Sequence, residues 1–434
     1  MKHLLKKCIV FSAMPGSVTW LVLLGVALLA IPALAEHEHI RNRAYVVGSD
    51  SGTVAVIDTD NNRVIATVKV GNCPYQVAVT PDGAHAYVTN QCSNSVSVID
   101  TRINTVVATI AIGSGGLLNG ATPFGIAITP DGDRAYVTNI NSDSVSVIDT
   151  HSNSVVATIK VGLSPWAIAI TPDGAYAYVT SFSSPYVTAI STASNTVAAT
   201  IEIGADPDGI AIAPDGARAY VTSFESNSVS VISTASNTVV ATIAGTTVSG
   251  KGVFTDGIAI TPDGAYTYVA NAYNFVDVID NASNTVVATV VGIGNNPQGL
   301  AINPEGTRAY LTNYASPFVS VIDTGNNKVI ATVGVPIDSQ GVAISPRIRP
   351  SKADELNGSN CDGEYTGTYH GDLTVSEGQV CIFTNGGITG SLTQTGGTLV
   401  LENNSFVRGD LKASGGSLTL SDSTVGTPHR SRER

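Results

Sequence analysis

The stretch AITPDGDRAYVTNINSDSVSVIDTHSNSVVATIK, residues 127–160, contains most of a unit that recurs along much of the chain. Its segments are rich in valine, isoleucine, tyrosine and threonine, which favour β-strands. Thr129-Pro130-Asp131-Gly132 predicts a tight turn, because proline presets φ, aspartate suits the next position and glycine takes the left-handed conformation. Serine alternates with valine in the third segment, as expected of a partly buried strand. Four strands follow from this pattern: Phe124–Thr129, Arg134–Asn139, Ser144–Asp149 and Ser154–Lys160.

Three parts of this unit recur seven times each. The tyrosine of the AYV segment, mostly spaced by 42 residues, stands at Tyr45, Tyr87, Tyr136, Tyr178, Tyr220, Tyr268 and Tyr310. Strands of the Val-Ile-Asp type contain Ile57, Ile99, Ile148, Ile190, Ile232, Ile279 and Ile322. Inner strands are centred on Ala78, Ala127, Ala169, Ala211, Ala259, Ala301 and Ala343. Four short strands in a unit of about 40 residues are typical of a propeller blade, so we predict an all-β fold with a seven-bladed β-propeller.

The order of the strands predicts how the ring closes. The chain enters the repeats at the AYV strand of Tyr45 and leaves them at an inner strand, Val342–Ser345. We therefore expect Gly341–Ser345 to pair with Tyr45–Gly48 and complete the first blade, which removes the open edges of the ring. The repeated tyrosines are expected to pack between blades, and the aspartates of the Pro-Asp-Gly turns to act as turn formers.

The repeat also carries a family resemblance. Tyr87–Asn90 and its copy Tyr136–Asn139, flanked by Pro-Asp-Gly and Val-Ile-Asp, resemble the YVTN-type β-propeller repeat family over residues 44–346. The resemblance implies an exported or surface-layer-like propeller. The Gly-His…Trp-Asp signature of WD40 blades does not occur in the sequence. A tryptophan in every blade, as quinone-binding propellers have, does not occur either, because the tryptophans are Trp20 and Trp166.

The N-terminus reads as an export signal. A basic start precedes the apolar run Trp20–Ala33, and Ala33-Leu34-Ala35 fits a cleavage site before Glu36. The alternative is an uncleaved membrane anchor, although the run is short for a span of about 20 residues. We expect residues 1–35 to be a signal peptide and the protein to lie in the periplasm, outside the cell or on its surface. With 22 Lys and Arg against 34 Asp and Glu, nucleic acid is not an expected partner.

A second kind of repeat follows the propeller. Gly371-Asp372-Leu373, Gly390-Ser391-Leu392 and Gly409-Asp410-Leu411 recur every 19 residues, each followed by a second β stretch. Two short strands per rung of this length predict a small β-solenoid-like module. The expected organisation is therefore a propeller at 36–346, a linker at 347–360, the module at 361–427 and a disordered tail at 428–434.

Four cysteines remain after removal of the signal segment. An even number in an exported chain predicts two disulfides, and we expect Cys73–Cys92 and Cys361–Cys381. Cys73 and Cys92 lie in two loops that flank one hairpin, so the loops should emerge on the same face of a blade. Unpaired thiols are the alternative. No Cys-x-x-Cys, His-Glu-x-x-His or Gly-x-Ser-x-Gly motif occurs, and the propeller's two histidines, His85 and His151, lie in different blades. The sequence therefore predicts no cofactor, no metal and no catalytic residue.

The candidate site is a position that varies from blade to blade where the chain enters the inner strand. Around the ring it reads Tyr75, Phe124, Trp166, Asp208, Asp256, Gln298 and Gln340. The position just after the AYVTN segment adds Phe182, Phe224 and Tyr314. Aromatic rings beside carboxylates at a channel mouth suit a sugar face or a cationic group. The alternative is that these side chains only plug the central channel.

The function expected from these features is that of an exported, non-catalytic propeller that binds a ligand or acts as a cell-surface scaffold. Its partner would be a carbohydrate, a cationic small molecule or a surface protein. The alternative is an exported enzyme of the lyase or lactone-hydrolase type that uses the channel mouth. A cofactor-dependent or electron-transfer propeller is a third class, for which the sequence offers no ligands.

Overall fold

The computed structural model describes residues 42–113, 120–204, 206–224, 226, 228–244, 257–271, 273–346, 363–369, 371–376, 379–402, 405–420 and 423–425. The expected signal peptide, linker and tail lie outside these residues. Seven four-stranded antiparallel sheets come first, followed by two parallel sheets. The one helix in the described residues is a 3-10 turn, Ile140–Ser142. The all-β class and the seven-bladed propeller are confirmed.

The two strands of each blade that lie nearest the propeller axis are the innermost strand and the second strand. The innermost strands, in the order of blades one to seven, are β28 Ser339–Ile344, β4 Pro74–Val79, β8 Pro123–Ile128, β12 Pro165–Ile170, β16 Pro207–Ile212, β20 Ile258–Ile260 and β24 Pro297–Ile302. The second strands, which carry the AYV segments, are β1 Arg43–Gly48, β5 His85–Asn90, β9 Arg134–Asn139, β13 Tyr176–Ser181, β17 Arg218–Ser223, β21 Tyr266–Asn271 and β25 Arg308–Asn313. The second strands are almost wholly buried because the neighbouring blades cover both of their faces.

Two further strands complete each blade. The third strands are β2 Thr53–Asp58, β6 Ser95–Asp100, β10 Ser144–Asp149, β14 Tyr186–Ser191, β18 Ser228–Ser233, β22 Phe275–Asp280 and β26 Phe318–Asp323. The outer strands are β3 Arg63–Lys69, β7 Thr105–Ala111, β11 Ser154–Lys160, β15 Thr196–Glu202, β19 Thr238–Ala244, β23 Thr285–Val290 and β27 Lys328–Gly334. The outer strands are mostly exposed and anchor themselves by one buried side chain near their ends, such as Ile110.

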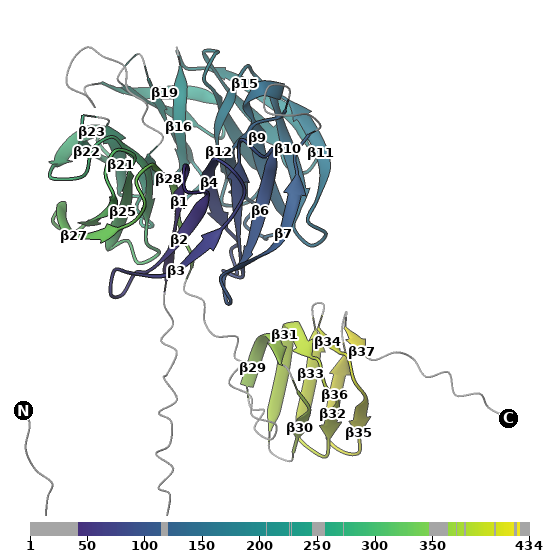
Figure 1. Cartoon of the computed structure of the whole chain (residues 1–434). Helices are drawn as coiled ribbons and strands as arrows, with labels where there is room; N and C mark the ends of the chain where they lie inside the picture. The colour runs from purple at the N-terminus through teal and green to yellow at the C-terminus, as the bar shows by residue number, and fades with distance from the viewer. Residues whose placement is uncertain are drawn as a thin grey trace, which may run out of the picture. The chain divides into compact units, whose positions relative to one another are not determined.

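The ring closes between the first and last strands of the propeller. β28 pairs antiparallel with β1, with Tyr45 opposite Ala343 and Val46 opposite Val342. Figure 1 shows the green strand β28 beside the purple strand β1, although nearly the whole propeller separates them in sequence. The predicted closure is confirmed, and the innermost and second strands of the first blade come from opposite ends of the repeat region.

The third strands are more deeply buried than their alternating pattern predicted. Ser97 and Ser146, expected on a partly exposed face, are 2% and 3% exposed, because the preceding blade covers the face that they share with Ile99 and Ile148. Their hydroxyls accept hydrogen bonds from the last residue of the second strand, with Asn90 Nδ2 3.0 Å from Ser97 and Asn139 Nδ2 2.9 Å from Ser146. The amide nitrogen of the YVTN asparagine and the serine hydroxyls thus bond to each other in the buried part of the blade, which supplies partners for these groups.

The repeated tyrosines join neighbouring blades, as predicted, and they also make a polar contact. Tyr136 is fully buried, and its hydroxyl donates to Asn195 of the next blade at 2.7 Å. Equivalent bonds join Tyr87 to Asn153 and, across the ring closure, Tyr310 to Asn62. Asparagine suits this turn because the position has a left-handed φ, near 50° at Asn153 and Asn195.

The Pro-Asp-Gly aspartates form turns, as predicted. The Thr129 hydroxyl donates to the Asp131 carboxylate at 2.5 Å, and the Asp133 amide donates to it at 3.0 Å. These hydrogen bonds lower the pKa of Asp131. Gly132 ends the turn with φ of 81°, a conformation that side chains with a Cβ rarely adopt. These carboxylates therefore accept hydrogen bonds within their own turns and stabilise them.

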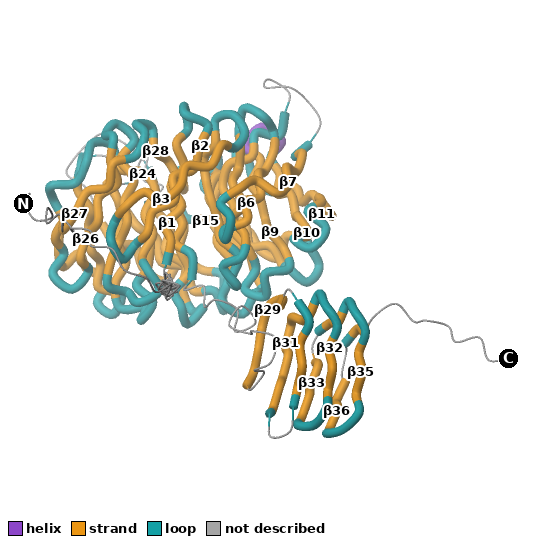
Figure 2. The backbone as a smooth tube through the Cα atoms, turned by 60° about the horizontal axis from the view of Figure 1, so that its bottom comes forward, coloured by secondary structure: helices purple, strands orange, loops and turns teal. Residues whose placement is uncertain are grey.

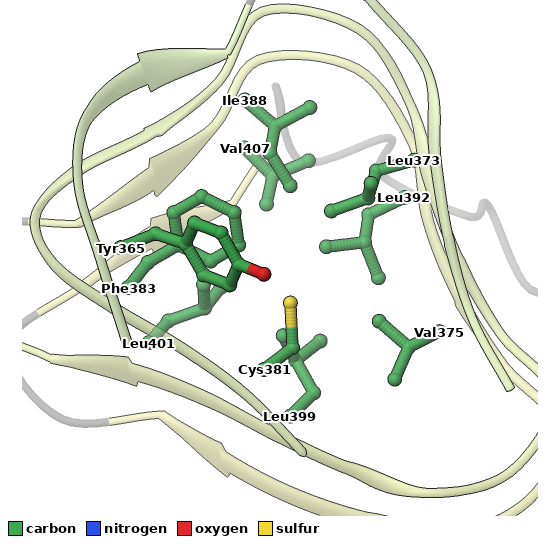
Figure 3. Close-up of a cluster of buried hydrophobic side chains, with 10 residues drawn as sticks. All are labelled: Tyr365, Leu373, Val375, Cys381, Phe383, Ile388, Leu392, Leu399, Leu401 and Val407. Atoms are coloured by element: carbon green, nitrogen blue, oxygen red, sulfur yellow. The ribbon is translucent and has the colours of Figure 1, made fainter. Parts of the chain in front are cut away.

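The C-terminal strands form a parallel stack. They are β29 Gly363–Tyr369, β30 Leu373–Val375, β31 Val380–Ile388, β32 Leu392–Gln394, β33 Thr398–Glu402, β34 Phe406–Val407, β35 Leu411–Ala413, β36 Ser417–Leu420 and β37 Thr424–Val425. Leu373, Leu392 and Leu411 lie side by side on β30, β32 and β35, in the predicted repeat of 19 residues. Figure 2 shows these strands running as successive rungs. Leucine, valine and phenylalanine side chains from both sheets meet inside the stack (Figure 3).

Candidate functional site: the mouth face of the propeller

Two loops of each blade meet on the face opposite the Pro-Asp-Gly turns, here called the mouth face. One is the lead-in loop before the innermost strand, and the other joins the second strand to the third. The first residue of the second loop donates its amide to a carbonyl of the lead-in loop, with Ile140 to Thr122 at 3.1 Å and Phe182 to Ser164 at 3.0 Å. The same bond occurs in six of the seven blades, since residue 272 in blade six lies outside the described residues.

The second blade strengthens this tie with a covalent bond. Gln91 and Cys92 donate to the carbonyls of Cys73 and Asn72, and a disulfide joins Cys73 to Cys92 with their Cα atoms 5.3 Å apart. The predicted Cys73–Cys92 bridge is confirmed. Cys381 is also disulfide-bonded, while its predicted partner Cys361 lies outside the described residues.

The varying position of the candidate site lies in a β-bulge. In blade two, Pro74 pairs with Asn90 and Val77 with Val88, so the innermost strand has one residue more than its neighbour between these pairs. Tyr75 and Gln76 occupy the bulge. The same shift surrounds Phe124, Trp166, Asp208, Gln298 and Gln340. A bulge bends the strand and re-aims a side chain, so the repeat itself provides a position whose side chain is released from the regular sheet.

The threonine of YVTN fixes the backbone at this position. Thr138 accepts a hydrogen bond from the Gly125 amide at 2.7 Å and donates to the carbonyl of Trp166 in the next blade at 2.6 Å. Thr89 reaches Phe124 and Thr180 reaches Asp208 in the same way. The innermost strands approach closely here, because a Cβ on Gly125 would lie 2.5 Å from the Trp166 carbonyl oxygen. The backbone here is thus alike in blades two, three, four and seven while the side chains vary. Blades one and six have Val47 and Ala270 in place of the threonine.

The predicted aromatic wall is continuous and longer than three residues. Ring centroids are 3.6 Å apart for Tyr75 and Phe124, and 3.8 Å apart for Phe124 and Trp166. Phe182 continues the row 5.2 Å from Trp166, and Phe224 lies 5.8 Å beyond Phe182. Phe124 is buried and the other four are partly exposed. Five rings from blades two to five therefore form one row, which we call the aromatic row.

The remaining predicted positions are polar and differ in exposure. Asp208 is completely buried and Gln298 is 8% exposed, whereas Gln340 and Tyr314 are partly exposed. The Gln298 amide donates to Asn296 at 3.1 Å. Asp256 lies outside the described residues. The structure therefore gathers five of the six aromatic candidates into one contact row, while Tyr314 lies in blade seven with Gln298, and Gln340 lies in blade one.

Sequence reasoning missed a pair of carboxyl groups on the mouth face. Asp338, in the lead-in loop of blade one, lies beside Asp50 in the second loop of the same blade, and desolvation together with this neighbouring acid raises the pKa of Asp338. The position itself gave no distinct signal, because other blades have Cys73, Thr122, Ser164, Asp206 or Asn296 there. The mouth face thus combines an aromatic row in blades two to five with amides and this acid pair in blades seven and one.

A second acid that the sequence analysis passed over lies inside blade six. Asp277 replaces the serine of the third strand, is 3% exposed and accepts hydrogen bonds from Asn271 at 3.1 Å and Thr289 at 2.9 Å. Burial raises its pKa to about 6. Its carboxyl group is buried on the face of the sheet that packs against blade five, since Ile279 on the same face clusters with residues of that blade. Substrate access would require the two blades to separate, so Asp277 belongs to the interior of the propeller.

The opposite face offers less chemistry. His151 lies 3.9 Å from Asp133 beside a turn, and both side chains are largely exposed. An open groove between blades six and seven is lined by Asp263, Tyr266 and Glu305, among others. Within the described ranges, no three His, Cys, Asp or Glu side chains gather in a way that could hold a metal ion. In the part of the chain that the structure describes, no helix has the length and the apolar character needed to cross a membrane.

Comparisons with known proteins agree with the fold. A family model described as "Lactonase, 7-bladed beta-propeller" matches residues 42–201. A curated protein search finds no match. Among solved structures, Kuenenia stuttgartiensis hydrazine synthase is 26% identical with a TM-score of 0.58, covering 64% of this chain and 92% of that one.

Two more solved structures share the fold at lower identity. A functionally unknown protein from Desulfotomaculum acetoxidans is 22% identical with a TM-score of 0.60, covering 70% of this chain and 99% of that one. The dihydro-heme d1 dehydrogenase NirN, in complex with DHE, is 16% identical with a TM-score of 0.52, covering 69% of this chain and 74% of that one. Propellers with this backbone thus occur in proteins of different description, and function has to be argued from the mouth face.

Proposed function

We propose that the protein is an exported binding propeller that holds a carbohydrate on its mouth face without transforming it. The observation that carries this proposal is the aromatic row, in which four partly exposed rings stand on the bulges and loops of neighbouring blades. Flat rings offer large apolar area at low entropic cost, and sugar rings present C–H faces that pack on them. Gln340 and the Asp50–Asp338 pair supply hydrogen-bonding groups on the other side of the mouth.

A rigid support favours binding over simple channel filling. The row is fixed by threonine hydrogen bonds between blades and by a disulfide in the loop that precedes Tyr75. If the side chains only filled the channel, a disulfide in the loop of this one blade would not be needed. A bound cationic group is the second ligand chemistry compatible with the row, because ring faces attract cations.

A glycan array tests the proposal. We expect residues 36–434 to bind a restricted set of glycans and Trp166→Ala to reduce that binding at least tenfold. The matched control is Tyr176→Ala, which removes a ring that is 37% exposed on the opposite face of the same blade. Absence of glycan binding, or equal binding by both variants, would contradict a carbohydrate function.

Lactone hydrolysis is the second candidate, and the family-model match over residues 42–201 favours it. Such an enzyme would need a group that activates water, and the Asp50–Asp338 pair offers carboxyl groups at the mouth. Under this alternative, the wild-type chain would turn over simple lactones and Asp338→Asn would abolish turnover, whereas Trp166→Ala would leave the chemical step intact. No lactone turnover is expected under the binding proposal.

A further inference from the structure

The C-terminal stack ends in an apolar edge. On β33, Leu399 and Leu401 point into the interior of the stack and are fully buried. Leu418 and Leu420 of β36 pair in register with these two residues, so they continue the same inward-facing columns. They are nevertheless 38% and 49% exposed. The last rung therefore presents to solvent the side chains that every earlier rung buries.

The backbone of this edge is also open. In the described part of the chain, β36 pairs with β33 and stands at the end of its sheet. An exposed edge strand offers a row of amide and carbonyl groups to another strand. Stacked repeats need a cap at such an end to remain soluble. Something is therefore expected to cover β36.

The residues that follow do not provide an apolar cover. Residues 426–434 read GTPHRSRER, without leucine, isoleucine, valine or phenylalanine. If the 19-residue repeat continued for another rung, Arg430 would take the inward-facing position that Leu373, Leu392 and Leu411 hold in the earlier rungs. A fourth leucine-bearing rung is therefore not supplied by these residues.

We propose that the edge is covered by the same edge of a second copy of the chain. An antiparallel pair of β36 strands keeps inward side chains inward when Leu418 lies opposite Leu420 of the other copy. This register places Thr419 opposite Thr419 on a two-fold axis, so both leucines of both copies are covered by one self-complementary contact. The two stacks then form one continuous sheet across the axis. Because the contact is a single rung wide, the dimer is expected to dissociate on dilution.

Sedimentation equilibrium of residues 36–434 tests the association. The wild-type chain should show a concentration-dependent mass of two copies, and Leu418→Thr with Leu420→Thr should remain a monomer with an unchanged circular dichroism spectrum. The control is Val240→Thr, which removes an exposed apolar residue from a propeller strand and should leave the dimer intact. A monomeric wild-type chain, a dimeric double variant or open-ended polymers would overturn the proposal.

Cysteine cross-linking tests the register independently of folding yield. Thr419→Cys should form a disulfide-linked dimer in an oxidising glutathione buffer, because facing Cα atoms lie about 5 Å apart. Ser417→Cys is the matched control, since the two copies of residue 417 would be four residues, about 13 Å, out of register. That distance exceeds the roughly 7 Å that a disulfide spans. Equal cross-linking of both variants, or of neither, would overturn the proposed register.

Discussion

The propeller and the C-terminal stack show two ways of ending a repeat. In the propeller, the last strand β28 pairs with the first strand β1, and the seven blades need no separate cap. In the stack, the repeat continues to β36 and leaves Leu418 and Leu420 exposed. A ring satisfies its terminal repeats with one another, whereas a linear stack must be covered by something else. The stability of the ring is therefore expected to depend on its closing strand, and the stack is expected to associate through its last rung.

Removing the closing strand should have the largest effect. A chain that ends after Ile337 lacks β28, so the edge of β1 opens and the propeller should aggregate or lose most of its cooperative unfolding. A chain that ends after Pro346 keeps β28 and should retain the propeller's unfolding transition. Thermal unfolding and light scattering of the two truncations provide the measurement. Equal melting temperatures for both would mean that closure does not stabilise the ring.

Loss of the disulfide should have the next largest effect. Cys73 and Cys92 are separated by 19 residues, and a loop of this size contributes about 3 kcal/mol by restricting the unfolded chain. Cys73→Ser with Cys92→Ser should therefore lower the free energy of unfolding by about 3 kcal/mol in urea titrations. An unchanged free energy of unfolding in the double variant would contradict the prediction.

Asp277 should make blade six more stable at low pH. Its pKa rises from 3.8 in the unfolded chain to about 6 in the fold, so the folded protein binds the proton more tightly. The stabilisation is present below the unfolded pKa and is lost as pH rises through about 6, at a cost of up to about 3 kcal/mol. Asp277→Asn should remove this dependence and stabilise the protein at neutral pH.

Urea unfolding of the wild type and of Asp277→Asn at about pH 4 and about pH 7 measures the effect. The gain in unfolding free energy should appear at the higher pH. Asn271 and Thr289 remain in place as hydrogen-bonding neighbours. A gain of equal size at both pH values would show that the variant acts through packing and that the titration of Asp277 is unimportant.

The contacts between blades should have the smallest individual effect. Tyr136→Phe removes the hydroxyl that donates to Asn195, and loss of one buried hydrogen bond should cost about 1 kcal/mol. Tyr176→Phe, at a ring that is 37% exposed, should change the unfolding free energy by less than about 0.5 kcal/mol. Similar costs for the two variants would show that the tyrosine hydroxyls do not join the blades.

The sequence predicted the ring well because the repeat specifies it many times over. Tyr136 and the strand around Ile148 each have six counterparts and the turn at Pro130 has five, so the number of blades and the closure followed from the spacing and order of the repeats. The Cys73–Cys92 bridge followed from hairpin geometry. The burial of Ser97 did not, because it depends on the neighbouring blade, which a pattern within one strand does not contain.

The candidate site was only partly predictable. Variation at Tyr75, Phe124 and Trp166 identified the row, but the bulges that hold these residues appear only in the strand register. The depth of Asp208 and the contact of Asp338 with Asp50 depend on packing between loops and blades. Both were outside the reach of the repeat pattern because neither depends on a local sequence signal.

The emission of Trp166 tests the central claim about the mouth face most directly. In a chain that begins at Glu36, Trp166 is the one tryptophan, and it lies in the middle of the aromatic row. Addition of a glycan identified on the array should change its emission saturably, and Tyr75→Ala should weaken the apparent affinity at least tenfold. Saturable binding of the same glycan without any change in Trp166 emission, and without any effect of Tyr75→Ala, would contradict binding at the aromatic row.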